Sequence, residues 1–178
     1  MHKDEIERAL KDKGDFVQID YLNRYINQMP ATEMKKFAFL KLAEIYTRKK
    51  MFGDAAKSYK NASISSFTFK EKIENYIKEI ESYIKGGDFF EAEKSFRRAV
   101  SEANIREQEE VKLRVKAIYK KEAEELEKQG KLNQASKFYE GLLKTNLPDI
   151  EKKQIKEKLI SIYEKIGKYN EAKMLRGL

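Results

Sequence analysis

The stretch Gly86–Ala92, which reads GGDFFEA, decides the fold because its pattern returns along the chain. After Gly87, aromatic or small residues stand at offsets of two, five, nine and twelve, and most of these offsets recur after four other positions. The anchors of the five copies are Gly14, Lys50, Gly87, Gly130 and Gly167, at spacings of 36, 37, 43 and 37 residues. Nearly constant spacing of this kind predicts an internal repeat.

The residues around each anchor predict two helices joined by a tight turn. Apolar residues recur at helical spacing before each anchor and again after it. Glycine suits the turn because it enters the left-handed conformation at no steric cost. We expect Asp88 with Glu91, and Asp15 with Gln18, to cap the second helix of their copies. An aromatic residue or leucine stands four residues before every anchor, at Leu10, Tyr46, Tyr83, Leu126 and Tyr163.

This pattern resembles the tetratricopeptide repeat, a helix–turn–helix unit of about 34 residues. The stretch 76–99 matches best, with Tyr76 in the place of the family's tryptophan. The run Asp54–Tyr59 is also similar to the helical solenoids of soluble NSF attachment proteins. The resemblance covers nearly the whole chain and implies an all-α protein, a right-handed α-solenoid of about five repeat units. The expected units are residues 2–30, 34–65, 70–104, 106–146 and 149–178, in a single domain over 1–178.

The composition agrees with long amphipathic helices that have solvated outer faces. Hydrophobic residues make up 40% of the chain and charged residues 38%, with only two prolines. The longest run without a charge is Asn61–Phe69, nine residues, whereas a helix that spans a bilayer needs about 20 apolar residues. There is no cysteine and no visible secretory signal. We therefore expect a cytoplasmic protein without a membrane span.

The residues offer little support for catalysis. The GGDFF stretch comes close to the hairpin signature of diguanylate cyclases, but that chemistry needs strands on both sides, and helical periodicity flanks it here. The single histidine, His2, cannot form a zinc site alone, and Ser58 and Ser95 have no histidine base. No phosphate-binding glycine loop of the Walker type is present. We expect a non-enzymatic protein with no catalytic residue, no bound metal and no cofactor.

In the tetratricopeptide family, the first helix of each pair lines a concave groove. The positions six and two residues before each of the last four anchors are therefore predicted to face a segment of a partner protein. In three of the repeat units these two positions hold an acidic residue and, four residues later, a basic residue. Such a pair could also do no more than stabilise its own helix. The candidate partner-binding residues are Glu44, Arg48, Glu81, Lys85, Glu124, Lys128, Ser161 and Lys165.

The net charge of +8 leaves a second function open, the binding of RNA or DNA phosphates. Residues 1–89 carry a net charge of +3 and residues 90–178 carry +5, so the halves show no basic block, and acidic residues are interleaved. The candidate basic patch is Lys112, Arg114, Lys116, Lys120 and Lys121 with Lys152, Lys153, Lys156 and Lys158.

Two apolar surfaces remain as alternatives. The linker residues Phe67 and Phe69, with Phe37 and Phe39, are expected to pack in the core or cover a gap between repeat units. If they are exposed, they could dock a partner helix. The last repeat unit could bind a second copy, which would give a homodimer or a self-assembling scaffold, through Tyr163, Ile166, Tyr169, Met174, Leu175 and Leu178.

Overall fold

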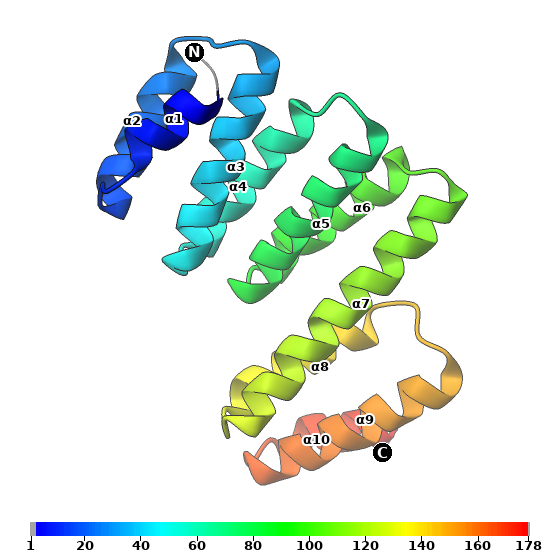
Figure 1. Ribbon diagram of the computed structural model, residues 1–178. Coiled ribbons are helices and arrows are strands. Elements are labelled where there is room, and N and C mark those ends of the chain that lie inside the picture. Colours follow the sequence, from blue (N-terminus) through cyan, green and yellow to red (C-terminus); the bar gives the residue numbers. More distant parts are fainter. Residues whose placement is uncertain (1–2, 178) are drawn as a thin grey trace. The chain divides into compact units, whose positions relative to one another are not determined.

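The computed structural model describes residues 3–177, and within this range it contains ten helices and no strand (Figure 1). The expected all-α class is confirmed, and helices that are adjacent in sequence pack against each other. His2 and Leu178 lie outside the described residues. The helices are α1 (Lys3–Leu10), α2 (Asp15–Asn27), α3 (Thr32–Arg48), α4 (Phe52–Ile64), α5 (Phe69–Lys85), α6 (Phe89–Glu102), α7 (Ile105–Lys128), α8 (Leu132–Leu143), α9 (Asp149–Lys165) and α10 (Tyr169–Arg176).

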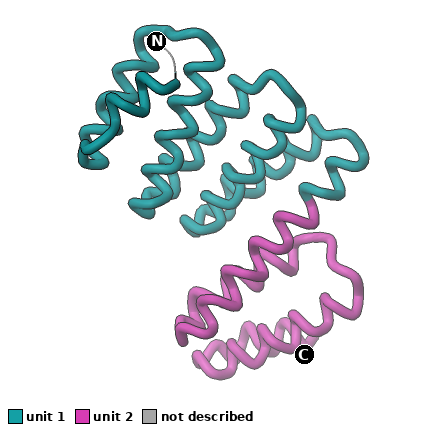
Figure 2. The backbone as a smooth tube through the Cα atoms, viewed as in Figure 1, with its two compact units in different colours: residues 1–111 teal, residues 112–178 magenta. Residues whose placement is uncertain are grey.

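The chain divides into two compact units, residues 1–111 and residues 112–178 (Figure 2). In unit 1 the helices α1 to α6 form three antiparallel pairs side by side, with the turns within pairs at one edge and the loops between pairs at the other (Figure 1). The division falls within α7, and unit 2 contains the rest of α7 with α8, α9 and α10. The five helix pairs begin and end within three residues of the predicted limits of the repeat units.

The repeated turn is a Schellman motif, which explains the sequence pattern around the anchors. Gly87 has a φ of 75°, and its neighbour Asp88 donates a backbone hydrogen bond of 2.9 Å to the Tyr83 carbonyl. This bond from the residue after a left-handed residue back to the last helical turn defines the motif. The same bond joins Met51 to Tyr46, Lys131 to Leu126 and Lys168 to Tyr163 at 2.9, 2.9 and 2.8 Å. The turn predicted at four anchors is therefore confirmed.

The first copy departs from the prediction. Gly14 has a φ of −65° and is the N-cap of α2, whereas the left-handed residue of this turn is Asp12, with a φ of 60°. The anchor assigned to Gly14 is therefore wrong. The predicted cap by Asp15 is wrong as well, because Asp15 is already the first helical residue. Gln18 instead donates from Nε2 to the carbonyls of Leu10 and Lys13, at 3.0 and 2.8 Å.

Two other caps hold the long middle section in register. The predicted cap by Asp88 is confirmed, since its carboxylate accepts a 3.1 Å hydrogen bond from the Glu91 amide. Between α6 and α7, the Asn104 side chain accepts from the Glu107 amide at 3.1 Å, and the Glu107 carboxylate accepts from the Asn104 amide at 2.9 Å. This reciprocal pair is a capping box that the sequence reading missed. It starts the 24-residue helix α7, which accounts for the 43-residue spacing.

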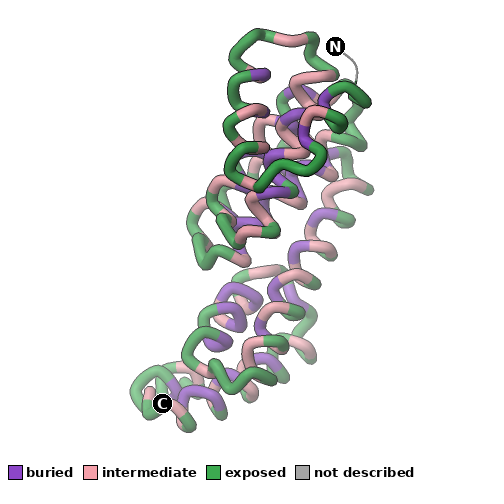
Figure 3. The backbone as a smooth tube through the Cα atoms, turned by 60° about the vertical axis from the view of Figure 1, so that its left-hand side comes forward, coloured by how far each residue is buried: buried purple, intermediate pink, exposed green. Residues whose placement is uncertain are grey.

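The buried residues follow the predicted stripes (Figure 3). The recurring alanines Ala55, Ala92, Ala135 and Ala172 are all at most 2% exposed. A small side chain at these positions lets two helices approach closely. Each compact unit thus has its own apolar core, into which the same position of successive helix pairs contributes an alanine.

The aromatic linker is exposed. Phe37 and Phe39 pack against the core as expected, but Phe67 and Phe69 are 69% and 68% exposed, so the expectation that they pack in the core is wrong. Thr68 between them has extended backbone and accepts a 3.2 Å hydrogen bond from the Glu71 amide as the N-cap of α5. Lys36 Nζ lies 5.5 Å from the centroid of the Phe67 ring, so this ring meets a cation at the surface.

The surface expected for self-association is mixed. Tyr169 and Met174 are 62% and 80% exposed. Tyr163 is buried, and its hydroxyl donates a 2.7 Å hydrogen bond to Glu140 within unit 2. The exposed apolar surface is therefore smaller than the sequence suggested, because Tyr163 on α9 does not belong to it.

Replacing Lys50 with glycine is expected to stabilise the protein by about 0.5–1 kcal/mol. Lys50 has a left-handed backbone conformation (φ 58°), which costs a residue with a Cβ roughly 1–2 kcal/mol. Glycine avoids this cost, but its greater conformational freedom in the unfolded chain cancels about 0.5–1 kcal/mol of the gain. Urea unfolding would measure the change. The reciprocal variant Gly87→Lys is the control and is expected to destabilise, since only the backbone conformation opposes it. A destabilised Lys50→Gly protein would contradict this account of the turn.

Candidate functional site

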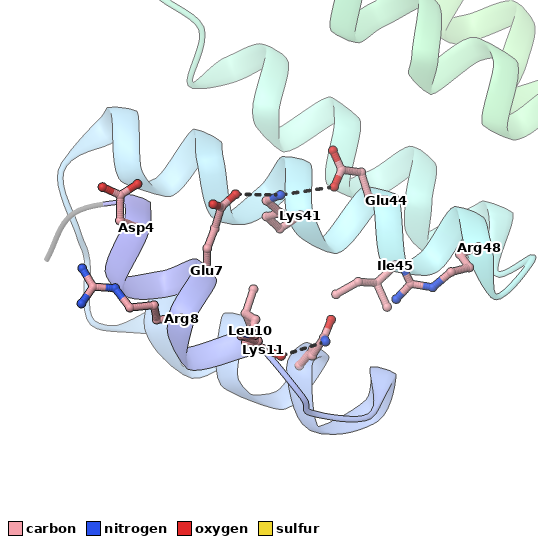
Figure 4. Close-up of a pocket in the computed structure, with 10 residues that line it drawn as sticks. Asp4, Glu7, Arg8, Leu10, Lys11, Lys41, Glu44, Ile45 and Arg48 are labelled. Carbon is pink, nitrogen blue, oxygen red and sulfur yellow. Dashed lines mark hydrogen bonds and ion pairs between the residues drawn. The ribbon is translucent and has the colours of Figure 1, made fainter.

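A concave site lies in unit 1, between α1 and α3 (Figure 4). The pocket encloses about 500 Å³. Leu10 and Ile45 are its apolar residues and are only 7% and 3% exposed, so they close it towards the core. The remaining lining residues are polar or charged, and they are Asp4, Glu7, Arg8, Lys11, Gln18, Lys41, Glu44 and Arg48.

Lys41 is the electrostatic centre of the pocket. Its Nζ lies 3.1 Å from Glu7 Oε1 on α1 and 3.7 Å from Glu44 Oε2 on its own helix, and Figure 4 shows it between the two carboxylates. The ammonium thus bridges the two walls. Arg8 and Lys11 also line the pocket, and the described contacts of neither side chain include an ion pair. These two cations are available to a partner.

Arg48 has a structural contact as well as a place in the pocket. Its guanidinium forms a short ion pair with Asp15 at the start of α2. The hydrogen bond from Arg48 lowers the pKa of the Asp15 carboxyl, although burial acts in the opposite direction. The predicted contact between Glu44 and Arg48 is absent from the described contacts, because each side chain has another partner: Lys41 for Glu44 and Asp15 for Arg48.

The structure brings the unit 1 candidates on α3 and α5 close to one tyrosine. Glu81 and Lys85 form the predicted i,i+4 pair, with Nζ and Oε1 2.6 Å apart. Burial raises the pKa of the Tyr59 phenol on α4, the charges of Glu44 and Glu81 raise it further, and Lys85 opposes them. Glu44, Glu81 and Lys85 are therefore near enough to act on the same hydroxyl.

The unit 2 candidates are more isolated. Lys128, Ser161 and Lys165 are exposed and Glu124 is half-buried, and the described contacts of these four side chains include no ion pair. The predicted pair between Glu124 and Lys128 is therefore not formed. One turn along α7, Glu127 instead contacts Tyr139 on α8 and Lys158 on α9. A role for these four residues in binding a partner stays a prediction.

Glu127 ties three helices of unit 2 together. Its Oε2 lies 2.8 Å from Lys158 Nζ on α9 and accepts a 2.8 Å hydrogen bond from the Tyr139 hydroxyl on α8. Burial raises the pKa of Tyr139 to about 12, and the bond to Glu127 adds to that increase. Glu127 and Lys158 are thus structural residues, which removes Lys158 from the candidate basic patch.

Several pocket residues were missed because they lie on α1, in the repeat unit that matches the sequence pattern least. The predicted groove positions came from the last four copies of the repeat, so none of them lies on α1. When the rule that selects Glu44 is applied to Asp12, the left-handed residue of the first turn, it gives Ile6, which is buried, so the rule carries no signal for the pocket residues of α1.

The serines considered as nucleophiles have structural roles. Ser58 donates a 2.8 Å hydrogen bond to the Asp54 carbonyl, and Ser95 donates one of the same length to the buried Glu79 carboxylate. Among residues 3–177, no group of three or more histidine, aspartate or glutamate side chains is arranged to hold a metal ion. Asp88 of the GGDFF stretch lies between two helices, so the strand hairpin that a cyclase signature requires is absent there.

Comparison with known proteins finds no family model that matches this chain and no curated protein that is similar to it. Within the described part of the chain, none of the helices combines the length and the apolar character needed to cross a bilayer.

Proposed function

We propose that this protein is a non-enzymatic interaction module whose unit 1 binds a segment of a partner polypeptide in the pocket between α1 and α3. The observation that carries the proposal is the composition of that pocket, with Leu10 and Ile45 at its buried side and charges of both signs at its rim. A partner side chain can occupy the apolar part while its neighbours meet the rim charges.

The pocket favours a polypeptide over a small cofactor. A volume of about 500 Å³ lies within the range of ligand sites, but such sites are lined mainly by apolar and aromatic side chains. Here only two of the ten lining residues are apolar, and no aromatic residue is among them. Rim charges of both signs, on a helix pair, suit recognition of a segment with a mixed charge pattern.

The surface used by the partner would extend from the pocket along unit 1. Glu44 belongs to the pocket, and with Glu81 and Lys85 on α5 it acts on Tyr59. A segment that leaves the pocket at Glu44 would meet Glu81 next. The recurring Schellman turns support the further proposal that the helix pairs are repeats of the tetratricopeptide type, stacked as a right-handed solenoid.

The test is a pull-down from native-host lysate after nuclease treatment, with three forms of the full chain. The wild-type protein is compared with Lys41→Glu/Arg48→Glu and with a charge-matched control, Lys57→Glu/Arg97→Glu. The control residues are on α4 and α6 and are 71% and 78% exposed. Loss of a discrete protein with the pocket variant, but not with the control, supports the proposal. Binding should then weaken by about tenfold or more in a purified system. Equal recovery with all three proteins would contradict it.

A further inference from the structure

The linker between α4 and α5 presents two exposed aromatic side chains. Phe67 and Phe69 are 69% and 68% exposed, and the linker lies at the edge of unit 1 that carries the loops between helix pairs (Figure 1). Only Thr68 separates the two residues, so their Cα atoms lie within about 7 Å of each other in any backbone conformation. A single short segment of a ligand can therefore cover both rings.

Hydrogen bonds on both sides hold this linker in place. On its α4 side, the Ser66 hydroxyl donates a 2.9 Å hydrogen bond to the Ala62 carbonyl and accepts one of 3.1 Å from Nδ2 of Asn75, which is only 5% exposed. On its α5 side, Thr68 accepts from the Glu71 amide at 3.2 Å. Because the neighbours of both rings are already fixed, a ligand orders little of the protein when it binds, which lowers the entropic cost of binding.

The Phe67 ring is also placed against α3. Lys36 Nζ lies 5.5 Å from the centroid of this ring and 3.0 Å from Glu71 Oε2 on α5. The Lys36 side chain is only 14% exposed, so this cation and the start of α5 support the ring from the protein side. The rest of the Phe67 ring surface stays open to a ligand.

The charges beside the rings leave one cation unneutralised. Glu71 is neutralised by its ion pair with α3, and Glu102 on α6 forms a short ion pair with Lys72, one turn after Phe69 on α5. Lys70 is exposed, and its described contacts include no ion pair. It follows Phe69 directly, so its flexible four-carbon side chain can reach an anion beside that ring. A ligand with an acidic group next to an apolar group therefore matches this surface in charge.

We propose that Phe67, Phe69 and Lys70, which we call the α4–α5 corner, bind a short acidic segment of a partner polypeptide. An aliphatic or aromatic side chain of the segment covers the two rings, and a neighbouring carboxylate pairs with Lys70. The corner shares no residue with the α1–α3 pocket, so the proposal does not depend on the function proposed for that pocket.

The size and charge of the corner favour this ligand over others. The two rings expose roughly 200–350 Å² in total, whereas a stable interface with a second copy needs about 800 Å² on each partner. A single-stranded nucleic acid can stack bases on exposed rings, but its affinity depends on several cations along the phosphates, and the corner offers one. Stable attachment to a bilayer needs a larger apolar face than two rings.

The test begins with the selection of short random peptides, displayed on phage, against the immobilised full chain. Peptides that also bind the Phe67→Ser/Phe69→Ser variant are removed by counter-selection. We expect the remaining peptides to share an aliphatic or aromatic residue next to an aspartate or glutamate. A labelled synthetic copy of one selected peptide is then measured by fluorescence anisotropy with the purified full chain, and a copy with amides in place of the carboxylates is the matched probe.

A first pair of variants locates the apolar contact. Phe67→Ser/Phe69→Ser is expected to weaken binding of the synthetic peptide by about tenfold or more, because the rings supply the apolar area that is buried. The control Phe16→Ser/Phe90→Ser removes equally exposed rings on α2 and α6, 69% and 78% exposed, and is expected to change the affinity by less than about twofold. Thermal unfolding would verify that each variant is folded.

A second pair of variants tests the charge. Lys70→Glu is expected to weaken binding by about threefold or more, and this loss should shrink as salt rises. The control Lys94→Glu makes the same change in net charge at an exposed lysine of α6 and is expected to weaken binding by less than about twofold. The peptide with amides should bind more weakly than the acidic peptide, and equally well to the wild-type protein and to Lys70→Glu.

Five outcomes would overturn the proposal. The first is recovery of no peptide whose binding requires Phe67 and Phe69, and the second is equal loss in the two serine variants. The third is equal binding of the acidic and amide peptides. The fourth is displacement of the peptide by a single-stranded homopolymeric DNA, which would assign the corner to nucleic acid. The fifth is loss of peptide binding in Lys41→Glu/Arg48→Glu with retention in Phe67→Ser/Phe69→Ser, which would assign the peptide to the α1–α3 pocket and leave the function proposed there intact.

Discussion

Replacing Arg98 with alanine is expected to lower the free energy of unfolding by about 3–5 kcal/mol, because it leaves a buried carboxylate without its cation. Glu79 on α5 is only 1% exposed. Arg98 on α6 donates to both of its carboxylate oxygens from Nη2, at 2.7 and 2.6 Å, and Ser95 donates a third hydrogen bond of 2.8 Å. Without the guanidinium, the charge of Glu79 stays in the core with a single hydroxyl to stabilise it.

The neighbouring arginine provides a matched control. Arg97 is 78% exposed and pairs with Glu93 one turn earlier at 2.9 Å, on the surface of the same helix. We expect Arg97→Ala to cost at most about 0.5 kcal/mol. Urea unfolding of both variants at neutral pH would give the two values. If they were equal, the buried pair between Glu79 and Arg98 would not be the feature that holds α5 to α6.

A double substitution separates the cost of an unpaired charge from the contribution of the pair. Glu79→Leu/Arg98→Met replaces both ions by apolar side chains of similar volume. Replacement of a buried ion pair in this way is often neutral or stabilising. We therefore expect the double variant to recover most of the stability that Arg98→Ala loses. A double variant as unstable as Arg98→Ala would indicate that the hydrogen bonds themselves hold the helix pair together.

The turns could be predicted from sequence because they depend on local conformation. A Schellman turn needs a residue that tolerates positive φ, and glycine marks that position at Gly87, Gly130 and Gly167. The same reasoning gave the wrong anchor at Gly14, where the glycine serves as an N-cap and Asp12 takes the left-handed conformation instead. An aspartate tolerates that conformation well enough to replace glycine, so composition alone did not identify the turn.

The ion pair within one helix between Glu81 and Lys85 could be predicted from its spacing, whereas the ion pairs between helices could not, because they join residues that are distant in sequence. Lys41 pairs with Glu7, 34 positions earlier, and not only with Glu44 on its own helix. The choice depends on how α1 lies against α3. Glu79 did carry a signal, since it falls within the apolar stripe between Tyr76 and Tyr83. A charged residue in such a stripe predicts a buried partner, although it does not say which residue that partner is.

Some of the candidate binding residues could be identified from the sequence, and others needed the structure. Glu44 and Arg48 were chosen by their distance from an anchor, and both line the pocket of unit 1. The candidate basic patch of residues 112–158 was named from the sequence, but the charge excess of unit 2 becomes visible only when the chain is divided at residue 111. The exposure of Leu113 and Ile150 needed the structure, since periodicity does not separate an exposed leucine from a buried one.

Replacing Gly141 with alanine is expected to destabilise the protein by about 1–2 kcal/mol, although alanine is the better helix former. Gly141 is buried within α8, and a Cβ at this position would lie 2.5 Å from Cε1 and 3.0 Å from Cδ1 of Tyr119 on α7. Tyr119 is itself only 7% exposed. Overpacking of this kind costs about 1–3 kcal/mol, whereas the gain in helix propensity is about 1 kcal/mol.

A double-mutant cycle tests whether the Tyr119 ring is the cause. Valine at position 119 lacks the ring atoms that an added Cβ would meet, so Gly141→Ala in a Tyr119→Val background is expected to stabilise by about 0.5–1 kcal/mol. Gly53→Ala is the control, since nothing lies within 4 Å of a Cβ added at this glycine of α4, and it is expected to be neutral or slightly stabilising. The sign of the Gly141→Ala effect should therefore reverse when the ring is removed. If alanine destabilised equally in both backgrounds, the cost would come from the backbone of α8, and the close approach of α7 and α8 at this glycine would not be what selects it.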